Sequence, residues 1–167
     1  QGEAYDYPEI FFKEKIHAIR RIQPDPNQIK LAAEKLKSSK QPIIIAGGGV
    51  LYSEAEKELS DFAKKHNIPV TPTVMGIGCM DRDDPYYIGA IGALGVGSSN
   101  NLSKDTDLAL AVGTKLGDFT TGSWANFENE DFKLVSINTT RFDVTKHRAT
   151  PVISDAKVGF KELSKAL

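Results

Sequence analysis

The chain has 167 residues, of which 40% are hydrophobic and 26% are charged. This is the composition of one globular domain that can bury a core without disulfides or metal, and it excludes disordered and fibrous chains. The 21 basic and 22 acidic residues nearly cancel, so no strong field of either sign can hold nucleic acid or an anionic membrane surface. No apolar run approaches the roughly 18 residues that span a bilayer. We therefore expect neither nucleic acid nor a membrane as a partner.

Cys79 is the only cysteine, which excludes a disulfide framework and a cysteine-based zinc site within the chain. A single cysteine is typical of a reducing compartment, and the first residues carry no signal-peptide pattern. We therefore expect a cytoplasmic location. The chain begins with Gln1 rather than Met, which hints at a piece of a longer protein, although processing gives the same appearance.

Residues 1–24 differ from the rest of the chain. Tyr5, Tyr7, Phe11 and Phe12 lie close together, and a basic stretch follows them. We interpret this segment as an interdomain linker, or arm, with a short helix. Two interpretations stay open: the arm packs on its own domain, or its aromatic side chains dock against a missing neighbour, since exposed aromatic patches usually mark interfaces.

The folded domain is predicted to cover residues 25–167 and to begin with a helix. Asp25 is suited to cap this helix and Pro26 to occupy its first position. Its buried face is predicted from helical spacing to hold Ile29, Ala32, Ala33 and Leu36. A second helix is predicted to begin at a capping box, residues 53–56, and to end at residues 64–67, where basic side chains suit the helix dipole.

The predicted strands are short apolar runs. Residues 43–46, 107–113 and 133–138 are apolar on both faces, as expected in the centre of a parallel sheet. Weaker or shorter strands are predicted at residues 69–71, 87–91 and 151–153, a helix or loop at 97–103, and a closing helix from Asp155. Strands that alternate with helices form βαβ units. We predict a Rossmann-like doubly wound α/β fold with six parallel strands in the order 3-2-1-4-5-6.

Such sheets bind ligands at the carboxyl ends of their strands, where the strand order reverses. Here that crevice is predicted between Gly47-Gly48-Gly49 and Gly113-Thr114. The glycines match only part of the dinucleotide pattern G-x-G-x-x-G, because its third position is Tyr52 and no acidic residue follows the next strand to hold an NAD ribose. Three interpretations stay open: an NAD site, a looser flavin or ADP site, or a tight strand-to-helix turn without a ligand.

Other candidate sites are weaker. The acidic cluster 81–84 lacks the rest of a calcium loop and is typical of a solvated turn. Cys79 could pair with His66 or His147 as a thiol and imidazole, but no sequence spacing brings them together. Trp124 lies in a loop at the ligand end of the sheet, where it serves either as an interface or site-wall residue or as a packing anchor. We expect no metal ligand and no catalytic residue.

The order of several short motifs resembles a known family. The motifs are Pro42–Val50, Phe62-Ala63 with Ile68–Val70, Asp84-Pro85 with Gly89 and Gly92, Asp107–Thr114 with Asp118 and Thr121-Gly122, and Asp155-Ala156. In this order they look like the central domain of thiamine-diphosphate-dependent enzymes of the acetolactate-synthase and decarboxylase superfamily. The resemblance covers residues 25–167 and implies a DHS-like NAD/FAD-binding domain type of fold.

Two segments, 46–53 and 118–127, with the arm motifs 3–8 and Arg20-Arg21, resemble a subfamily more narrowly. It is the subfamily of hydrolases of myo-inositol catabolism that open a trihydroxycyclohexane-1,2-dione. The resemblance implies cleavage of a C–C bond with thiamine diphosphate as electron sink, and release of 5-deoxyglucuronate. It also marks Thr121, Gly122, Ser123 and Trp124 as candidates for the substrate entrance or an interface.

The resemblance also implies what other domains must supply. In the family, an N-terminal domain carries the glutamate that activates the cofactor, and a C-terminal domain carries the G-D-G…N motif that holds Mg²⁺ and diphosphate. This sequence contains no Gly-Asp-Gly, so we expect no cofactor in the isolated chain, which should be inactive, and a homo-oligomer for the full-length enzyme. Flavin-binding relatives have Asp where this chain has Asn138. This departure opposes the alternative, an FAD- or ADP-binding central domain of an acetolactate-synthase-like enzyme.

Overall fold

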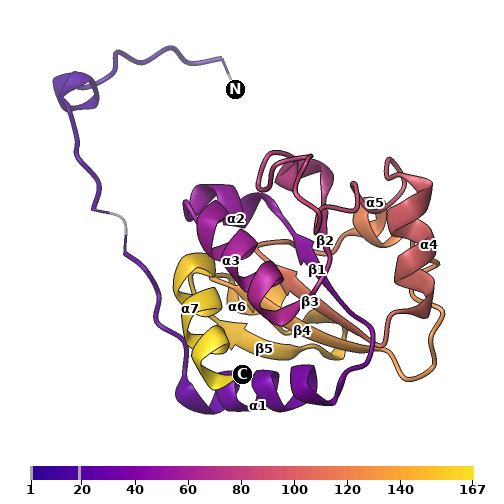
Figure 1. The fold of residues 1–167 in the computed structure, drawn as a ribbon. Coiled ribbons are helices and arrows are strands. Elements are labelled where there is room, and N and C mark those ends of the chain that lie inside the picture. Colours follow the sequence, from indigo (N-terminus) through magenta and orange to yellow (C-terminus); the bar gives the residue numbers. More distant parts are fainter. Residues whose placement is uncertain (1, 19) are drawn as a thin grey trace.

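Five parallel strands form the centre of the domain in the computed structural model, which describes residues 2–18 and 20–167 (Figure 1). In chain order they are β1 (Pro42–Ala46), β2 (Val70–Pro72), β3 (Leu108–Val112), β4 (Lys133–Asn138) and β5 (Thr150–Ile153). Their order across the sheet is β2-β1-β3-β4-β5. The order reverses between β1 and β3, so a crevice opens there at the carboxyl ends of the strands.

The prediction of six strands was wrong. Of residues 87–91, only Tyr87 forms a bridge, a parallel one to Val70, at the free edge of β2. Gly89 and Gly92 have φ angles of +91° and +103°, which interrupt an extended strand because only glycine adopts this backbone easily. The segment runs beside β2 without continuing the ladder, so the predicted order 3-2-1-4-5-6 is not confirmed.

Side chains of the central strands β1, β3 and β4 alternate between two separate cores. On one face, Ile44 and Leu110 pack with the helices α1 (Pro26–Ser38), α3 (Glu56–His66) and α7 (Ala156–Ala166). On the other face, Ile43 and Ala109 pack under Ile91, Leu116 and the side chains around Trp124. Both faces are covered, which explains why the central strands β1 and β3 are apolar in every position.

The first two long helices show one confirmed and one wrong prediction. Asp25 caps α1 through hydrogen bonds from the amides of Asn27 and Gln28, as predicted. The prediction that a helix begins at a capping box, residues 53–56, was wrong. The glycine turn itself opens a short helix, α2 (Gly48–Tyr52), and Ser53 lies at the C-terminal end of that helix. The helix α3 therefore begins at Glu56, after Ala55, which makes no side-chain cap.

The remaining helices are shorter or lie at the domain's edges. They are η1 (Glu9–Phe12), η2 (Val74–Gly76), α4 (Gly97–Asp105), α5 (Asp118–Thr121), α6 (Arg141–Val144) and η3 (Lys146–Arg148). The predicted helix or loop at residues 97–103 is thus a helix. Within the described residues, none of these helices combines the length and the hydropathy that crossing a membrane would require.

The arm joins the domain at Arg21. The Nη1 atom of Arg21 donates to the carbonyl of Ser53 at 2.6 Å and to the carboxylate of Asp155 at 3.1 Å. Next to it, the amide of Asp155 and the hydroxyl of Ser154 donate to the carbonyl of Ile22. Before this junction, the arm extends away from the domain (Figure 1).

We expect Arg21→Gln to lower the free energy of unfolding by about 1 kcal/mol, because it removes charge-assisted hydrogen bonds at a half-buried site. Asp155 would still cap α7 through the amides of Lys157 and Val158. Urea denaturation measures the effect. Arg20→Gln is the matched control, since it removes the same charge from an exposed neighbour. Equal effects of the two substitutions would contradict a specific junction at Arg21.

Candidate functional site

A cavity of about 790 Å³ lies at the carboxyl ends of the strands, where the strand order reverses. Its walls come from the segments that follow β1, β2, β3, β4 and β5. Four of the five predicted crevice residues line it, namely Gly48, Gly49, Gly113 and Thr114. Gly47 and the loop of residues 121–124 are not among its lining residues.

The glycine turn is packed directly against the end of β3. The amide of Gly47 donates to the carbonyl of Val112 at 2.8 Å, and the amide of Gly49 donates to that of Gly113 at 3.0 Å. A methyl group on Gly49 would lie 2.6 Å from the Cα of Gly113. Two of the amides that a pyrophosphate would need are therefore already bonded within the protein, and the close approach of two backbones explains these glycines without a ligand.

Asn138 is also engaged within the protein. Its side-chain amide donates to the carbonyl of Thr114 at 3.1 Å and accepts from the amide of Thr140 at 3.0 Å. These bonds hold the end of β4 against the loop after β3. The Asn138 side chain thus fixes the crevice wall, with both its nitrogen and its oxygen engaged within the protein.

The carboxylates at the cavity are paired with cations. Asp143 accepts from Lys146 at 2.6 Å, and Asp155 accepts from Arg21 at 3.1 Å while capping α7. Among residues 2–18 and 20–167, no three His, Cys, Asp or Glu side chains are grouped as a metal site would require. The residues present here therefore do not fit the Mg²⁺ and diphosphate of thiamine diphosphate, since hard cations need free oxygen ligands.

The loop of residues 121–124 turns sharply beside the second core. Gly122, Ser123 and Trp124 have φ angles of +57°, +53° and +71°, and the buried Thr121 hydroxyl accepts from the amide of Trp124. The indole of Trp124 is half-buried and lies 4.5 Å from the His147 ring, between ring centroids. It contacts the aromatic side chains of Phe127 and Phe132 as well. Trp124 thus has a packing role, while Ser123 is exposed.

The remaining candidates from the sequence are not brought together. His66 bonds the Ser164 hydroxyl at 3.0 Å, and His147 packs on Trp124, so each ring has a partner other than Cys79. In the acidic cluster 81–84, Asp84 accepts from Lys64 and from the backbone amide of Tyr86. Its hydrogen bonds, led by that of the Tyr86 amide, lower the pKa of Asp84. The cluster is a structural turn.

We expect Cys79 to resist thiol reagents in the folded protein. The side chain is fully buried, and this burial raises the pKa of the thiol to about 11, whereas the thiolate is the reactive form. At pH 8, an aromatic disulfide reagent should therefore react only at the rate of unfolding. The same reagent in urea provides the control for full reactivity. Rapid reaction in the native state would show that the segment around Cys79 opens.

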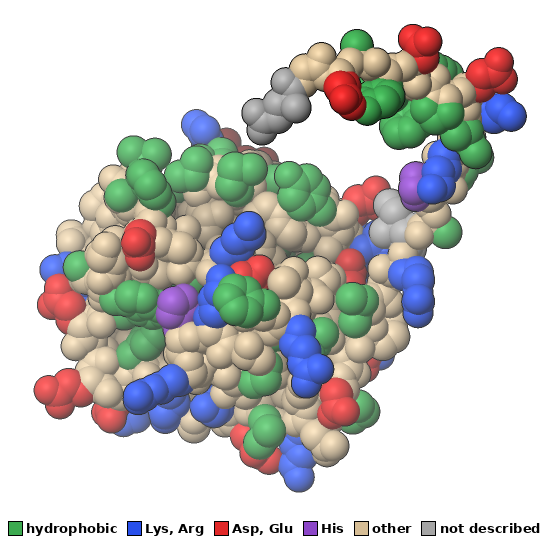
Figure 2. All heavy atoms as spheres, turned by 180° about the vertical axis from the view of Figure 1, so that it is seen from behind, with side chains coloured by type: hydrophobic (Ala, Val, Ile, Leu, Met, Phe, Trp, Pro, Cys, Tyr) green, Lys and Arg blue, Asp and Glu red, His purple; other side chains and the backbone are tan. Residues whose placement is uncertain are grey.

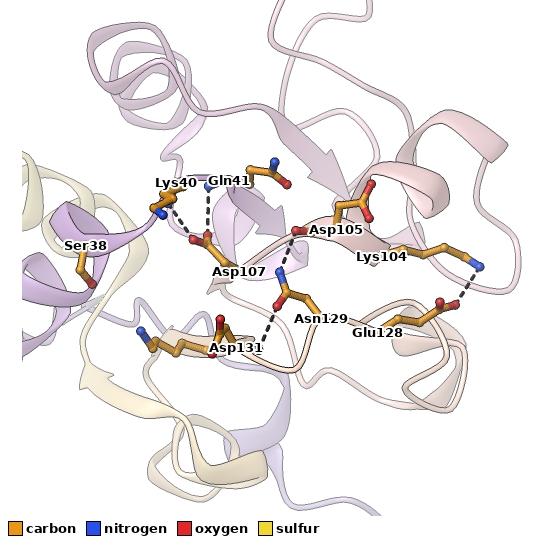
Figure 3. A pocket seen from close by; sticks show the side chains of 10 residues that line it. Ser38, Lys40, Gln41, Lys104, Asp105, Asp107, Glu128, Asn129 and Asp131 are labelled. Atoms are coloured by element: carbon orange, nitrogen blue, oxygen red, sulfur yellow. Dashed lines mark hydrogen bonds and ion pairs between the residues drawn. The ribbon is translucent and has the colours of Figure 1, made fainter.

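A second hollow, of about 670 Å³, lies at the opposite end of the sheet (Figure 3). Asp107 points into it and accepts from the amides of Lys40 and Gln41 at 2.7 Å and 3.0 Å, and from the Ser39 hydroxyl. From the sequence, Asp107 was predicted only as the first residue of a strand, and its hydrogen bonds were not predicted. The sequence signal for this structural contact is an acidic residue before an apolar run, together with polar residues before the neighbouring strand.

Comparisons with known proteins agree with the parallel α/β fold described above. The family described as "Thiamine pyrophosphate enzyme, central domain" matches residues 29–163. A 3D-(3,5/4)-trihydroxycyclohexane-1,2-dione hydrolase of Clostridium tetani is 43% identical over all 167 residues, which cover 26% of that relative. A hydrolase of the same name from Bacillus cereus, numbered 1, is 41% identical over 94% of this chain and 24% of its own length.

One solved structure shows the same fold. It is described as a thiamin diphosphate-dependent enzyme isolated from Mycobacterium smegmatis, and it matches 92% of this chain and 30% of its own chain with a TM-score of 0.72 and 17% identity. The chain thus spans about a quarter of the length of its curated relatives. The family match, which covers most of the chain, places it plainly: the chain belongs to the central domains of thiamine pyrophosphate enzymes.

Proposed function

We propose that this chain is the central domain of a longer thiamine-diphosphate-dependent enzyme that hydrolyses 3D-(3,5/4)-trihydroxycyclohexane-1,2-dione to 5-deoxyglucuronate in myo-inositol catabolism. The observation that carries the proposal is the 43% identity to a hydrolase of that name over the whole chain. Residues 25–167 form the domain and residues 1–24 the linker. The full-length enzyme is a cytoplasmic homo-oligomer.

In this proposal the domain carries no catalytic residue. It spaces the flanking domains, which bind thiamine diphosphate and Mg²⁺, and its loop of residues 121–124 lies at the substrate entrance or an interface. The bound cofactor supplies the electron sink for C–C cleavage. Two observations support a structural role: the carboxylates at the cavity are paired with Arg21 and Lys146, and the amides of the glycine turn are bonded to β3.

The residue at position 138 and the bonded amides of the glycine turn oppose the alternative of an FAD- or ADP-binding domain. The crevice lacks the aspartate of flavin-binding relatives, and Asn138 in its place is bonded to Thr114 and Thr140. Calorimetric titration of the full-length protein with FAD and with ADP tests this alternative. Binding of either nucleotide at micromolar concentration, lost on substitution of Thr139 at the cavity wall, would restore it.

We expect the full-length protein, supplied with thiamine diphosphate and Mg²⁺, to convert the cyclic dione to 5-deoxyglucuronate, as followed by mass spectrometry. The 167-residue chain under the same conditions should give no product, because its cavity offers no free carboxylates for the metal. Acetolactate formation from pyruvate by the full-length protein, without turnover of the dione, would contradict the proposed substrate. Turnover by the 167-residue chain would contradict the non-catalytic role.

A further inference from the structure

The helix α4 is attached to the domain by polar side chains. Its buried residues are Ser99 and Ser103, and none of its residues, all of which the structure describes, belongs to either hydrophobic core. Leu102 on α4 is exposed, as are Leu94 and Val96 just before it. Figure 2 shows hydrophobic side chains at the surface on this side of the domain, away from the arm. The position of α4 therefore depends on hydrogen bonds rather than on apolar packing.

Three side chains in the first turn of α4 bind alternate carbonyl groups of the segment that precedes the helix. They are Ser98, Ser99 and Asn100, which donate to the carbonyls of Ile88, Ala90 and Gly92, respectively. Asn100 also accepts from the amide of Gly92 at 2.9 Å, so its side chain binds this glycine through both its nitrogen and its oxygen. The segment is itself bonded to β2, and it thus connects α4 to the sheet.

The same residues reach the segment that begins with α5. A methyl group on Gly92 would lie 2.0 Å from the carbonyl oxygen of Phe119, and the amide of Ala93 donates to that carbonyl at 2.7 Å. The side-chain oxygen of Asn100 accepts a further hydrogen bond, at 3.3 Å, from the side-chain amide of Asn126. The helix α4, which lies next to α5 in Figure 1, is therefore attached to this segment at two points.

The loop that follows α5 lies between these two attachments and has a strained backbone. Ser123 and Trp124 have positive φ angles, which residues other than glycine rarely adopt. Such conformations persist only where the surrounding structure holds them. A methyl group on Gly122 would lie 3.3 Å from the side-chain oxygen of Asn126. Asn126 therefore packs against the loop and connects it to Asn100.

We propose that Asn100 is a positioning residue, which holds the segment 118–126 in the geometry that admits the cyclic dione. Phe119 and Thr120 of this segment line the cavity. The inference rests on the proposed function for the place of the loop 121–124 at the substrate entrance. Asn100 is not among the residues that line the cavity, so it acts through its hydrogen bonds. Its removal should move the loop and leave both cores intact, because α4 lies outside them.

Tryptophan fluorescence tests the position of the loop. Trp124 is the only tryptophan of the chain and is half-buried. In the 167-residue chain, we expect Asn100→Ala to shift its emission to longer wavelength and to increase its quenching by acrylamide, while the far-UV circular dichroism stays that of the parent. Asn101→Ala is the matched control, since Asn101 is the exposed next residue on α4. Identical emission from the parent and Asn100→Ala would overturn the proposal.

Asn126→Ala removes the same connection from the side of the loop. We expect it to shift the emission of Trp124 in the same direction. The double variant with Asn100→Ala should shift the emission no further than the larger of the two single shifts, because changes that remove one shared contact are not additive. Additive shifts would show that Asn100 does not act through Asn126 and would overturn the proposal, as would a folded Asn126→Ala variant with the emission of the parent.

Kinetics of the full-length protein test the consequence for the substrate. We expect Asn100→Ala to raise the KM for the dione about tenfold and to change kcat less than about twofold, because entry is impaired and the chemical step is not. Asn101→Ala should change neither. An unchanged KM in Asn100→Ala would overturn the role at the entrance. A parent protein that does not hydrolyse the dione would contradict only the proposed substrate, because the emission of Trp124 still decides whether Asn100 positions the loop.

Discussion

Replacement of Gly49 by Ala is expected to lower the free energy of unfolding by about 3 kcal/mol, measured by urea denaturation of the 167-residue chain. The new methyl group would lie 2.6 Å from the Cα and 3.0 Å from the carbonyl oxygen of Gly113. Both are backbone atoms at the end of a central strand, so neither can rotate away as a side chain could. Relief requires β3 and α2 to separate, which also breaks the hydrogen bond from Gly49 to Gly113.

Gly97→Ala is the matched control. Like Gly49, Gly97 lies in the first turn of a helix, but a methyl group there would meet no atom within 4 Å. Alanine is a better helix former than glycine by up to about 1 kcal/mol, so this substitution should leave the protein equally stable or slightly more stable. A Gly49→Ala variant as stable as Gly97→Ala would show that the glycine turn is not held by backbone packing.

Removal of the Asp107 carboxylate is expected to destabilise the domain by about 2 kcal/mol. In the Asp107→Ala variant, the amides of Lys40 and Gln41 and the Ser39 hydroxyl lose their acceptor. These three groups form the loop that joins α1 to β1, so the loss loosens one end of a central strand. Urea denaturation at pH 7 measures the change. Asp105→Ala is the control, because Asp105 lines the same hollow and is exposed.

The same contact predicts a pH dependence. Burial raises the pKa of Asp107, but the hydrogen bonds from Lys40, Ser39 and Gln41 outweigh it, so the pKa lies below its ordinary value in the folded protein. The folded state therefore binds fewer protons, and the stabilisation is present above the unfolded pKa of about 3.9 and lost as pH falls through the folded one. The difference in stability between the parent and Asp107→Asn should shrink below about pH 4. A constant difference would refute the assignment.

Local signals predicted the parts of the fold whose causes are local. Asp25 and Pro26 specify the start of α1 through one side chain and one ring, and Asn67 ends α3 with a φ of +54°. The helix α2 was not predicted, because two glycines at its start oppose helix formation. Its cause is tertiary: only glycine lets this turn approach Gly113, and that contact lies far along the chain.

The candidate site shows the same division between features with local causes and features with tertiary causes. The sequence predicted the crevice from Gly47 to Gly49 and from Gly113, and the structure brings these segments together. It could not show that the amides of the turn are already bonded, because their acceptors belong to β3. The prediction of a sixth strand failed for a related reason, since Gly89 and Gly92 turn the chain away from the β-ladder after Tyr87.

The junction at Arg21 bears on where this domain can be cut. A fragment that starts at Asp25 keeps every helix and strand of the domain but loses Arg21 and Ile22, whose groups bond Ser53, Ser154 and Asp155. The unit that can be transplanted intact into a chimeric protein therefore starts a few residues earlier, at Arg20 or Arg21. Domain exchange among relatives should succeed more often when the crossover point precedes this arginine than when it follows it.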